Sequence, residues 1–125
     1  MEILEKLRQF LLGGPGLQEL SADFPQDGPG NAGLFPGEVT EVERSTDLLG
    51  NARVRYACLF TLYKRLEPGQ DSAQWLLELQ SWLAERTDAV QVRKAKAQEV
   101  SRLQCALCTV TLAVRFWKHY DAKEE

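Results

Sequence analysis

The residues best suited to chemistry in this chain are three cysteines and a single histidine. Cys105 and Cys108 have the C-x-x-C spacing that, in a turn, can hold zinc or act as a redox dithiol. Here the pair lies in an alternation of apolar and polar residues typical of a strand, where residues three apart point to opposite faces. The two sulfurs therefore cannot share one ion, and only Cys58 and His119 remain as further soft ligands. We expect apolar, inert thiols, no metal and no cofactor.

The histidine is also the only base available to a Ser-His-Asp or Cys-His arrangement. His119 lies between Lys118 and Tyr120 near the polar end of the chain, which predicts a solvent-exposed side chain. Acidic pairs such as Glu41 with Glu43 occur on an edge strand without an apolar pocket to raise a pKa. The sequence therefore predicts that the protein is not an enzyme.

Basic and aromatic residues in the expected strands are the candidate contact residues. They are Arg53, Arg55, Tyr63, Arg65, Arg93, Lys94, Lys96 and Trp117. Such a set can line a nucleic-acid groove. However, the net charge is −3, from 15 basic and 18 acidic residues, so no strong field attracts polyanions. We therefore favour contacts between subunits, including ion pairs, over specific binding of nucleic acid.

The elements that position these residues follow from hydrophobic periodicity and chain breakers. Apolar residues at three-and-four spacing predict a helix over residues 1–12, followed by a Gly/Pro-rich loop over 13–37 with at most a short strand near 17–22. Strands are expected over 38–66, with a weakly patterned edge strand at its start, a turn near 45–51 and a clear strand from Arg53 to Leu66.

In the second half, Asp71 followed by Gln74 resembles a capping box that opens a helix over 71–86. Strands are expected over 89–120: an outer strand, Val90 to Val100, that projects beyond the sheet, and a long closing strand from Gln104 to Tyr120. A disordered tail is expected over 121–125. This order favours an α+β fold, an antiparallel or mixed sheet of four to five strands with two helices packed on one face.

The opposite face of that sheet is expected to be too apolar to remain wholly in water. It would carry Leu59, Thr61, Tyr63, Thr109, Thr111, Ala113 and Trp117. A neighbouring subunit is the simplest cover for it.

Bulk properties predict a single globular domain over residues 1–125. Apolar residues make up 44% and charged residues 26%, which is ordinary for a globular protein. The chain contains no apolar run near the ~20 residues that cross a bilayer, and its start lacks the pattern of a secretory signal. We therefore expect a protein made in a cytoplasm, with no membrane partner.

A family resemblance extends from about residue 17 to residue 120. It is carried by Asp23-Phe24-Pro25, Asp27-Gly28-Pro29-Gly30-Asn31 and Leu34-Phe35-Pro36, followed by the strand from Arg53 to Tyr63, the helix from Asp71 to Glu85 and the closing strand. In order and spacing these segments resemble the tail-terminator-like proteins of long-tailed bacteriophages and prophages, also called minor capsid or tail-completion proteins.

The resemblance implies a structural protein that forms a ring, usually a hexamer, at the end of the tail tube. Its partners would be further copies of itself, the tail-tube protein and the head-tail connector protein. It would reside in the host bacterial cytoplasm during assembly and then in the virion tail. A head-tail adaptor or another non-enzymatic assembly factor is the alternative, and a small enzyme is the third reading.

Overall fold

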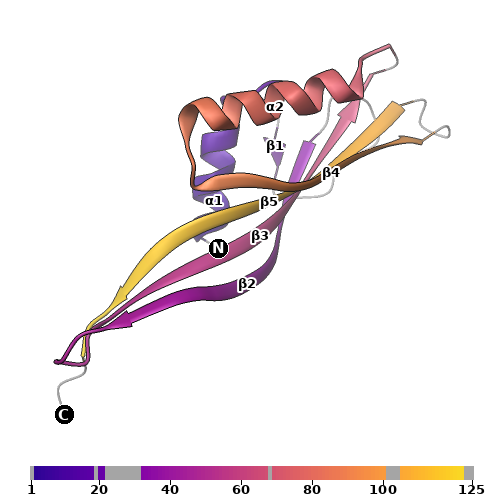
Figure 1. Ribbon diagram of the computed structural model, residues 1–125. Coiled ribbons are helices and arrows are strands. Elements are labelled where there is room, and N and C mark those ends of the chain that lie inside the picture. The colour runs from indigo at the N-terminus through magenta and orange to yellow at the C-terminus, as the bar shows by residue number, and fades with distance from the viewer. Residues whose placement is uncertain (1, 19, 22–31, 68, 101–104, 123–125) are drawn as a thin grey trace.

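The computed structural model describes residues 2–18, 20–21, 32–67, 69–100 and 105–122. Its elements are α1 (Glu2–Leu11), β1 (Leu20–Ser21), β2 (Ala32–Thr46), β3 (Ala52–Leu66), α2 (Ser72–Arg86), β4 (Val90–Val100) and β5 (Cys105–Tyr120). The strands form one sheet in the order β1-β2-β3-β5-β4 (Figure 1). The four long strands pair antiparallel, and β1 pairs parallel with β2. The expected α+β class is confirmed.

One face of the sheet builds the core against both helices. Alternate residues of the central strands share this face, which we call the core face; those buried against the helices include Cys58, Phe60, Leu62, Cys108, Val110 and Leu112. From the helices, Leu7 and Leu11 of α1 and Trp75, Leu79 and Leu83 of α2 complete the cluster. We call the opposite face the helix-free face. Two helices therefore cover one face, as the apolar stripes predict.

Helix α2 forms where the sequence predicts, and a side-chain cap fixes its start. The Asp71 carboxylate accepts hydrogen bonds from the backbone N–H groups of Ala73 and Gln74 at 3.0 and 3.3 Å. The Gln74 side chain instead donates to Glu78, so the expected capping box is only half formed. The indole N–H of Trp75 donates to the carbonyl of Pro15 at 2.8 Å, which fastens α2 to the turn after α1.

The Gly/Pro-rich segment ends earlier than expected, because β2 begins at Ala32 rather than near Glu38. Leu34 is fully buried opposite Leu62 in the core. A bulge between Pro36 and Val39 accommodates the proline, and a Cβ on Gly37 would lie 2.9 Å from the Leu59 carbonyl oxygen. The expected loop over 13–37 is therefore wrong for its last six residues, and residues 22–31 lie outside the described part of the chain.

Strand β4 is an outer strand, as predicted, but it does not project beyond the sheet. It pairs with β5 from Val90, opposite Val114, through Val100, opposite Cys105. A bulge between Val92 and Lys94 shifts the register by one residue. The charged residues that suggested a projecting segment are therefore the exposed side chains of a paired edge strand.

Strands β2, β3 and β5 continue past the helices as a three-stranded ribbon (Figure 1), which we call the arm and define as residues 37–46, 52–57 and 115–120. Val54 is fully buried there, although it is not part of the core cluster beneath the helices. The rings of Tyr56 and Phe116 stack with centroids 5.6 Å apart, and the hydroxyls of Tyr56 and Tyr120 are 2.7 Å apart. The strand register places Val54 between these two tyrosines on one face. The arm therefore has a small cluster of its own.

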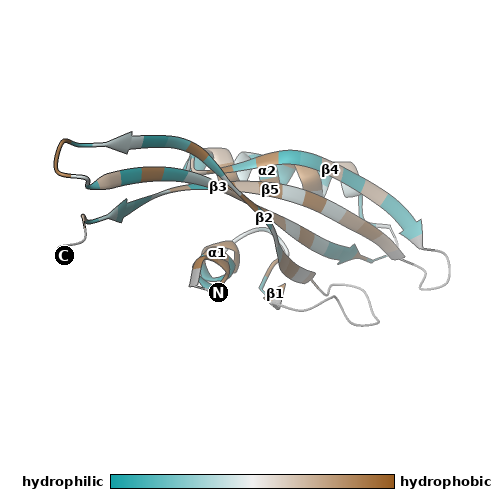
Figure 2. Cartoon of the chain, turned by 90° about the horizontal axis from the view of Figure 1, so that it is seen from below, coloured by the Kyte–Doolittle hydropathy of each residue, from teal (hydrophilic) through white to brown (hydrophobic). Residues whose placement is uncertain are grey.

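The arm ends in a tight hairpin whose tip is apolar. The Asp47 carboxylate accepts hydrogen bonds from the backbone N–H groups of Leu49 and Asn51 at 2.9 and 3.0 Å, and Gly50 adopts a positive φ of 87°. Leu48 and Leu49 point into solvent at the tip, which is brown in Figure 2. A disordered tail was expected over 121–125. The backbone N–H of Ala122 instead donates a hydrogen bond to the Asn51 side chain at 2.7 Å, and residues 123–125 lie outside the described part of the chain.

Candidate interaction surface

Two of the three cysteines expected to be inert, Cys58 and Cys108, lie where they cannot react readily. Cys58 and Cys108 are buried on the core face, and desolvation raises the pKa of each thiol. The side chain of Cys105 lies outside the described part of the structure. His119 is exposed near the end of the arm. Across the described residues, no three His, Cys, Asp or Glu side chains gather as metal ligands would.

The helix-free face is the first candidate surface. Leu59, Thr61 and Tyr63 of β3 lie beside Thr109 and Thr111 of β5 on this face, and all five side chains are partly exposed. Neither described helix packs there, because both are accounted for in the core on the other side. Leucine, tyrosine and threonine methyl groups make this face mixed rather than fully polar, which is typical of a surface that another protein covers.

The basic and aromatic candidates on the arm form a real cluster. The Arg53 guanidinium lies 4.2 Å from the centroid of the Trp117 ring, and that of Arg55 lies 5.9 Å from it. Trp117 is 39% exposed and belongs to the helix-free face. The cation–π contacts hold a large aromatic ring at the surface in a defined position. Such rigid aromatic and arginine groups are the kind that dominate binding energy at interfaces.

Arg115 extends this cluster toward β4, although it was not among the contact residues predicted from the sequence. A hollow of about 300 Å³ is lined by Arg55, Arg115, Trp117 and Asp88 together with Ala89, Gln91 and Phe116. The signal was present, since Arg115 precedes Trp117 by two residues and so shares its face. The neighbourhood of Asp88 was not predictable, because it depends on where the chain turns from α2 into β4.

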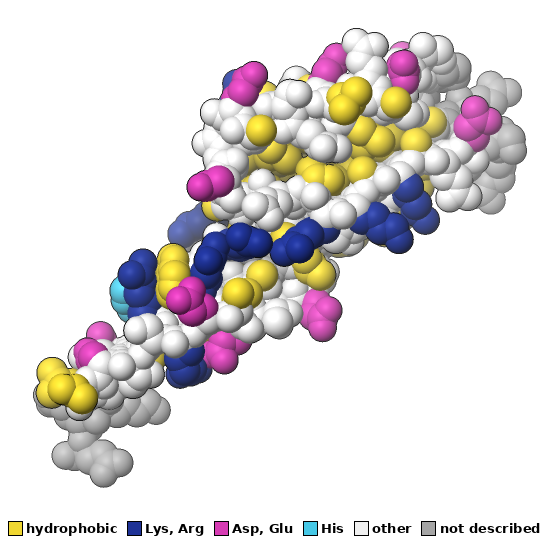
Figure 3. Space-filling model, viewed as in Figure 1, with side chains coloured by type: hydrophobic (Ala, Val, Ile, Leu, Met, Phe, Trp, Pro, Cys, Tyr) yellow, Lys and Arg dark blue, Asp and Glu magenta, His cyan; other side chains and the backbone are white. Residues whose placement is uncertain are grey.

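The lysines on β4 are exposed on the helix-free face, where Lys94 lies opposite Thr111 and Lys96 opposite Thr109. Arg93 is exposed at the bulge. Figure 3 shows Lys and Arg side chains in a row along the sheet and acidic side chains on the helix above it, while the arm carries both kinds. The structure therefore separates charges that the net charge of the whole chain conceals.

The remaining two candidates differ in their environments. Tyr63 packs edge-on against Phe35, with ring centroids 5.5 Å apart, and stays partly exposed. Arg65 is only 5% exposed. Contact with a partner through Arg65 would first require the side chain to move out of its buried site, so we remove it from the candidate contact residues.

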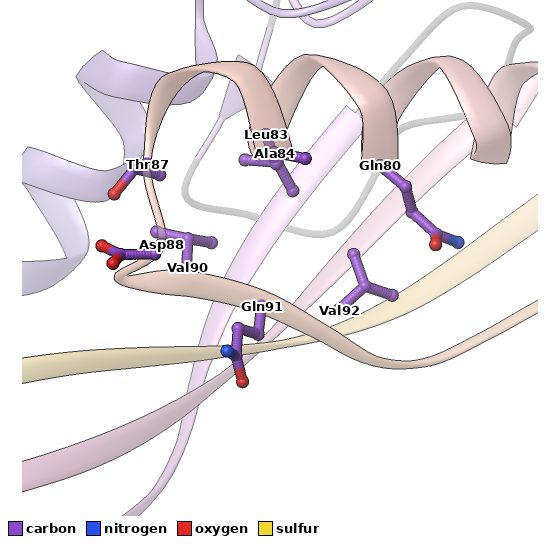
Figure 4. Close-up of a pocket in the computed structure, with 8 residues that line it drawn as sticks. All are labelled: Gln80, Leu83, Ala84, Thr87, Asp88, Val90, Gln91 and Val92. Atoms are coloured by element: carbon purple, nitrogen blue, oxygen red, sulfur yellow. The ribbon is translucent and has the colours of Figure 1, made fainter.

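A second hollow, of about 440 Å³, lies between α2 and β4 (Figure 4). Leu83 and Ala84 of α2 and Val90 and Val92 of β4 supply apolar walls, while Gln80, Thr87, Asp88 and Gln91 supply polar groups at its rim. Figure 4 shows Gln91 pointing away from the helix. The hollow exists because α2 crosses above the outer strand and no described element fills the space between them.

None of the described helices is both long and apolar enough to cross a membrane. A scan against protein-family models finds no match to this chain, and a search of curated proteins likewise finds no similar protein.

Proposed function

We propose that this chain is a structural subunit of a phage or prophage tail, one that forms a ring at the end of the tail tube and joins it to the head connector. The observation that supports the proposal best is the helix-free face, whose leucine, tyrosine and threonine side chains are partly exposed while both described helices cover the other face. Exposed apolar groups mixed with polar ones on one face are typical of a surface that another protein covers.

The arm fits the same role. It extends the helix-free face beyond the body of the protein and carries Trp117, held by Arg53 and Arg55, on the extended part. A subunit in a closed ring contacts its neighbours through two different surfaces, and it must also contact the tube and the connector. A long sheet with chemically different parts offers several such surfaces on a small protein.

In this proposal the protein is made in the host bacterial cytoplasm and ends in the virion tail. Its partners are other copies of itself, in the hexamer that the resemblance implies, and the tail-tube and head-tail connector proteins. The arrangement of the described residues suggests binding rather than catalysis, because the buried thiols have raised pKa values and His119 is exposed at the end of a strand.

The proposal is tested by measuring the mass of the purified protein and by deleting its gene from the phage that carries it. We expect a closed assembly of several copies by native mass spectrometry, with rings visible by electron microscopy. We expect the deletion to leave heads and tails that do not join. Joined virions in the absence of the gene would contradict the proposal.

A pair of variants links this test to the helix-free face. Thr111→Arg places a long charged side chain in the middle of that face, whereas Leu77→Arg changes a side chain that is 65% exposed on α2. Both variants should remain folded by circular dichroism. We expect Leu77→Arg to restore joined virions to the deletion phage and Thr111→Arg to fail.

A further inference from the structure

The outermost long strands of the sheet, β2 and β4, carry opposite charge. On β2 the charged residues are Glu38, Glu41, Glu43 and Arg44, three acids and one base, a formal charge of −2. On β4 they are Arg93, Lys94, Lys96 and Glu99, three bases and one acid, a formal charge of +2. Figure 2 shows hydrophilic residues along both strands. The edges of this sheet are therefore equal in magnitude and opposite in sign.

Both edges are open to another chain within the described structure. Strand β1 pairs only with Ala32 and Gly33, so no described strand lies beside the outer side of β2 along its charged part, from Glu38 to Thr46. Strand β4 ends the sheet on the other side. An open strand edge presents backbone N–H and C=O groups that can pair with another strand.

We propose that copies of this chain join by pairing β2 of one copy with β4 of the next, so that the sheet continues from subunit to subunit. The inference rests on the self-assembly in the proposed function but not on the identity of the tail. The directions of the strands agree with it: since β2, β3, β5 and β4 alternate in direction across the sheet, β2 and β4 run antiparallel to one another. A neighbour placed with its helices on the same side therefore presents an antiparallel edge, like the other long pairs.

Charge selects this head-to-tail contact over a two-fold one. A two-fold dimer would place β4 against β4, three bases facing three bases, or β2 against β2, three acids facing three acids. Only the β2 to β4 contact brings unlike charges together. Because this contact uses two different edges, each copy keeps a free β2 on one side and a free β4 on the other, and a chain of copies grows until it closes.

This mode of assembly leaves the helix-free face uncovered. The cluster around Trp117 and the threonines of β3 and β5 would then line one side of the assembled ring, available to the tail tube or the connector. Copies therefore join through edges, and other proteins bind through the face.

Charge reversal tests the inference with purified full-length protein. One variant carries Lys94→Glu with Lys96→Glu, a second carries Glu38→Lys with Glu43→Lys, and a third carries all four changes. These side chains are exposed, so the fold should persist by circular dichroism. The third variant has the net charge of the original protein, which separates edge pairing from effects of total charge.

We expect each two-site variant to lose self-association by more than about 100-fold, because like charges then face each other across the contact. We expect the four-site variant to recover it, since its edges are again opposite in sign. An equimolar mixture of the two-site variants should assemble with one copy of each in alternation. Association of the original protein should weaken at high salt, where the screening length falls to about 3 Å at 1 M.

A control variant, Glu78→Lys with Glu85→Lys, changes total charge on α2 as much as the β2 variant does and should assemble normally. If both two-site variants assemble as the original does, the edge charges only keep strands from aggregating, and the inference fails while the proposed ring stands. A four-site variant that folds but stays monomeric also overturns the inference. An original protein that stays monomeric at low salt overturns both the inference and the proposed ring.

Discussion

Val54 tests whether the arm is stabilised by its own cluster or only as an extension of the core. Its side chain is fully buried, yet it is not among the residues packed beneath the helices. Val54→Ala removes two carbon atoms, at ~0.8 kcal/mol each for transfer from water. The cavity left behind adds up to about 1 kcal/mol if the neighbouring side chains do not collapse into it. We therefore expect Val54→Ala to lower the free energy of local opening of the arm by about 1.6 to 2.6 kcal/mol.

Hydrogen exchange followed by mass spectrometry measures this loss where it occurs. An energy of this size raises the population of the open arm by about 15- to 80-fold. Exchange should accelerate by that factor in residues 52–57 and 115–120, whereas residues 58–66 and 106–113, in the body of the sheet, should exchange as before. The reason is that segments with separate clusters open as separate units.

Two further valines provide the controls. Val42 lies on the arm but is 55% exposed, so Val42→Ala should change the stability of the arm by less than about 0.5 kcal/mol. Val110 is buried in the core, so Val110→Ala should accelerate exchange throughout the sheet. If Val54→Ala accelerated exchange equally in arm and body, the two would form one cooperative unit. If it had no more effect than Val42→Ala, the arm cluster would contribute nothing.

Three further outcomes are expected. Asp71→Ala removes the side-chain cap of α2 and should destabilise the fold by about 1 kcal/mol in denaturant unfolding, while Asp71→Ser should retain most of the stability. Hydrogen bonds from Asn51 hold the pKa of Asp47 in the folded protein below its ordinary value. The hairpin tip should therefore be most stable above the unfolded-state pKa of Asp47 and loosen as the pH falls through the lower pKa of the folded protein. The amide shifts of Asn51 in NMR spectra should report this change. Cys58 and Cys108 should react slowly with iodoacetamide in the folded protein and rapidly in denaturant; rapid reaction when folded would contradict the burial.

Much of the fold was predictable because local patterns and tertiary packing agree. The two-residue alternation of β3 and β5 predicted their core faces, and the spacing of Trp75, Leu79 and Leu83 predicted the buried side of α2. The start of β2 was not predicted, because it contains Gly33, Pro36 and Gly37, residue types that are typical of loops. A proline and glycines are tolerated there since this strand is bulged and lies near the edge of the sheet.

The candidate surface was predictable only in part. Alternation is enough to place Trp117 and Arg115 on one face. It could not show that Arg53 and Arg55 approach the Trp117 ring, because that contact joins strands separated by about half of the chain. Arg65 looked equivalent to the other arginines in sequence, yet the structure buries it. Periodicity assigns a residue to a face, and it does not tell how far along that face the neighbouring elements extend.

The sequence by itself determined the class of fold, the two apolar helix stripes and the placing of the cysteines in apolar strands, because each depends on spacing within one segment. The tertiary structure alone decided the order in which the strands pair, that the arm extends past the helices, and that opposite charges occupy opposite sides of the sheet. Those properties depend on strand order. Strand order is set by which segments pack together across the whole chain, and no local pattern encodes it.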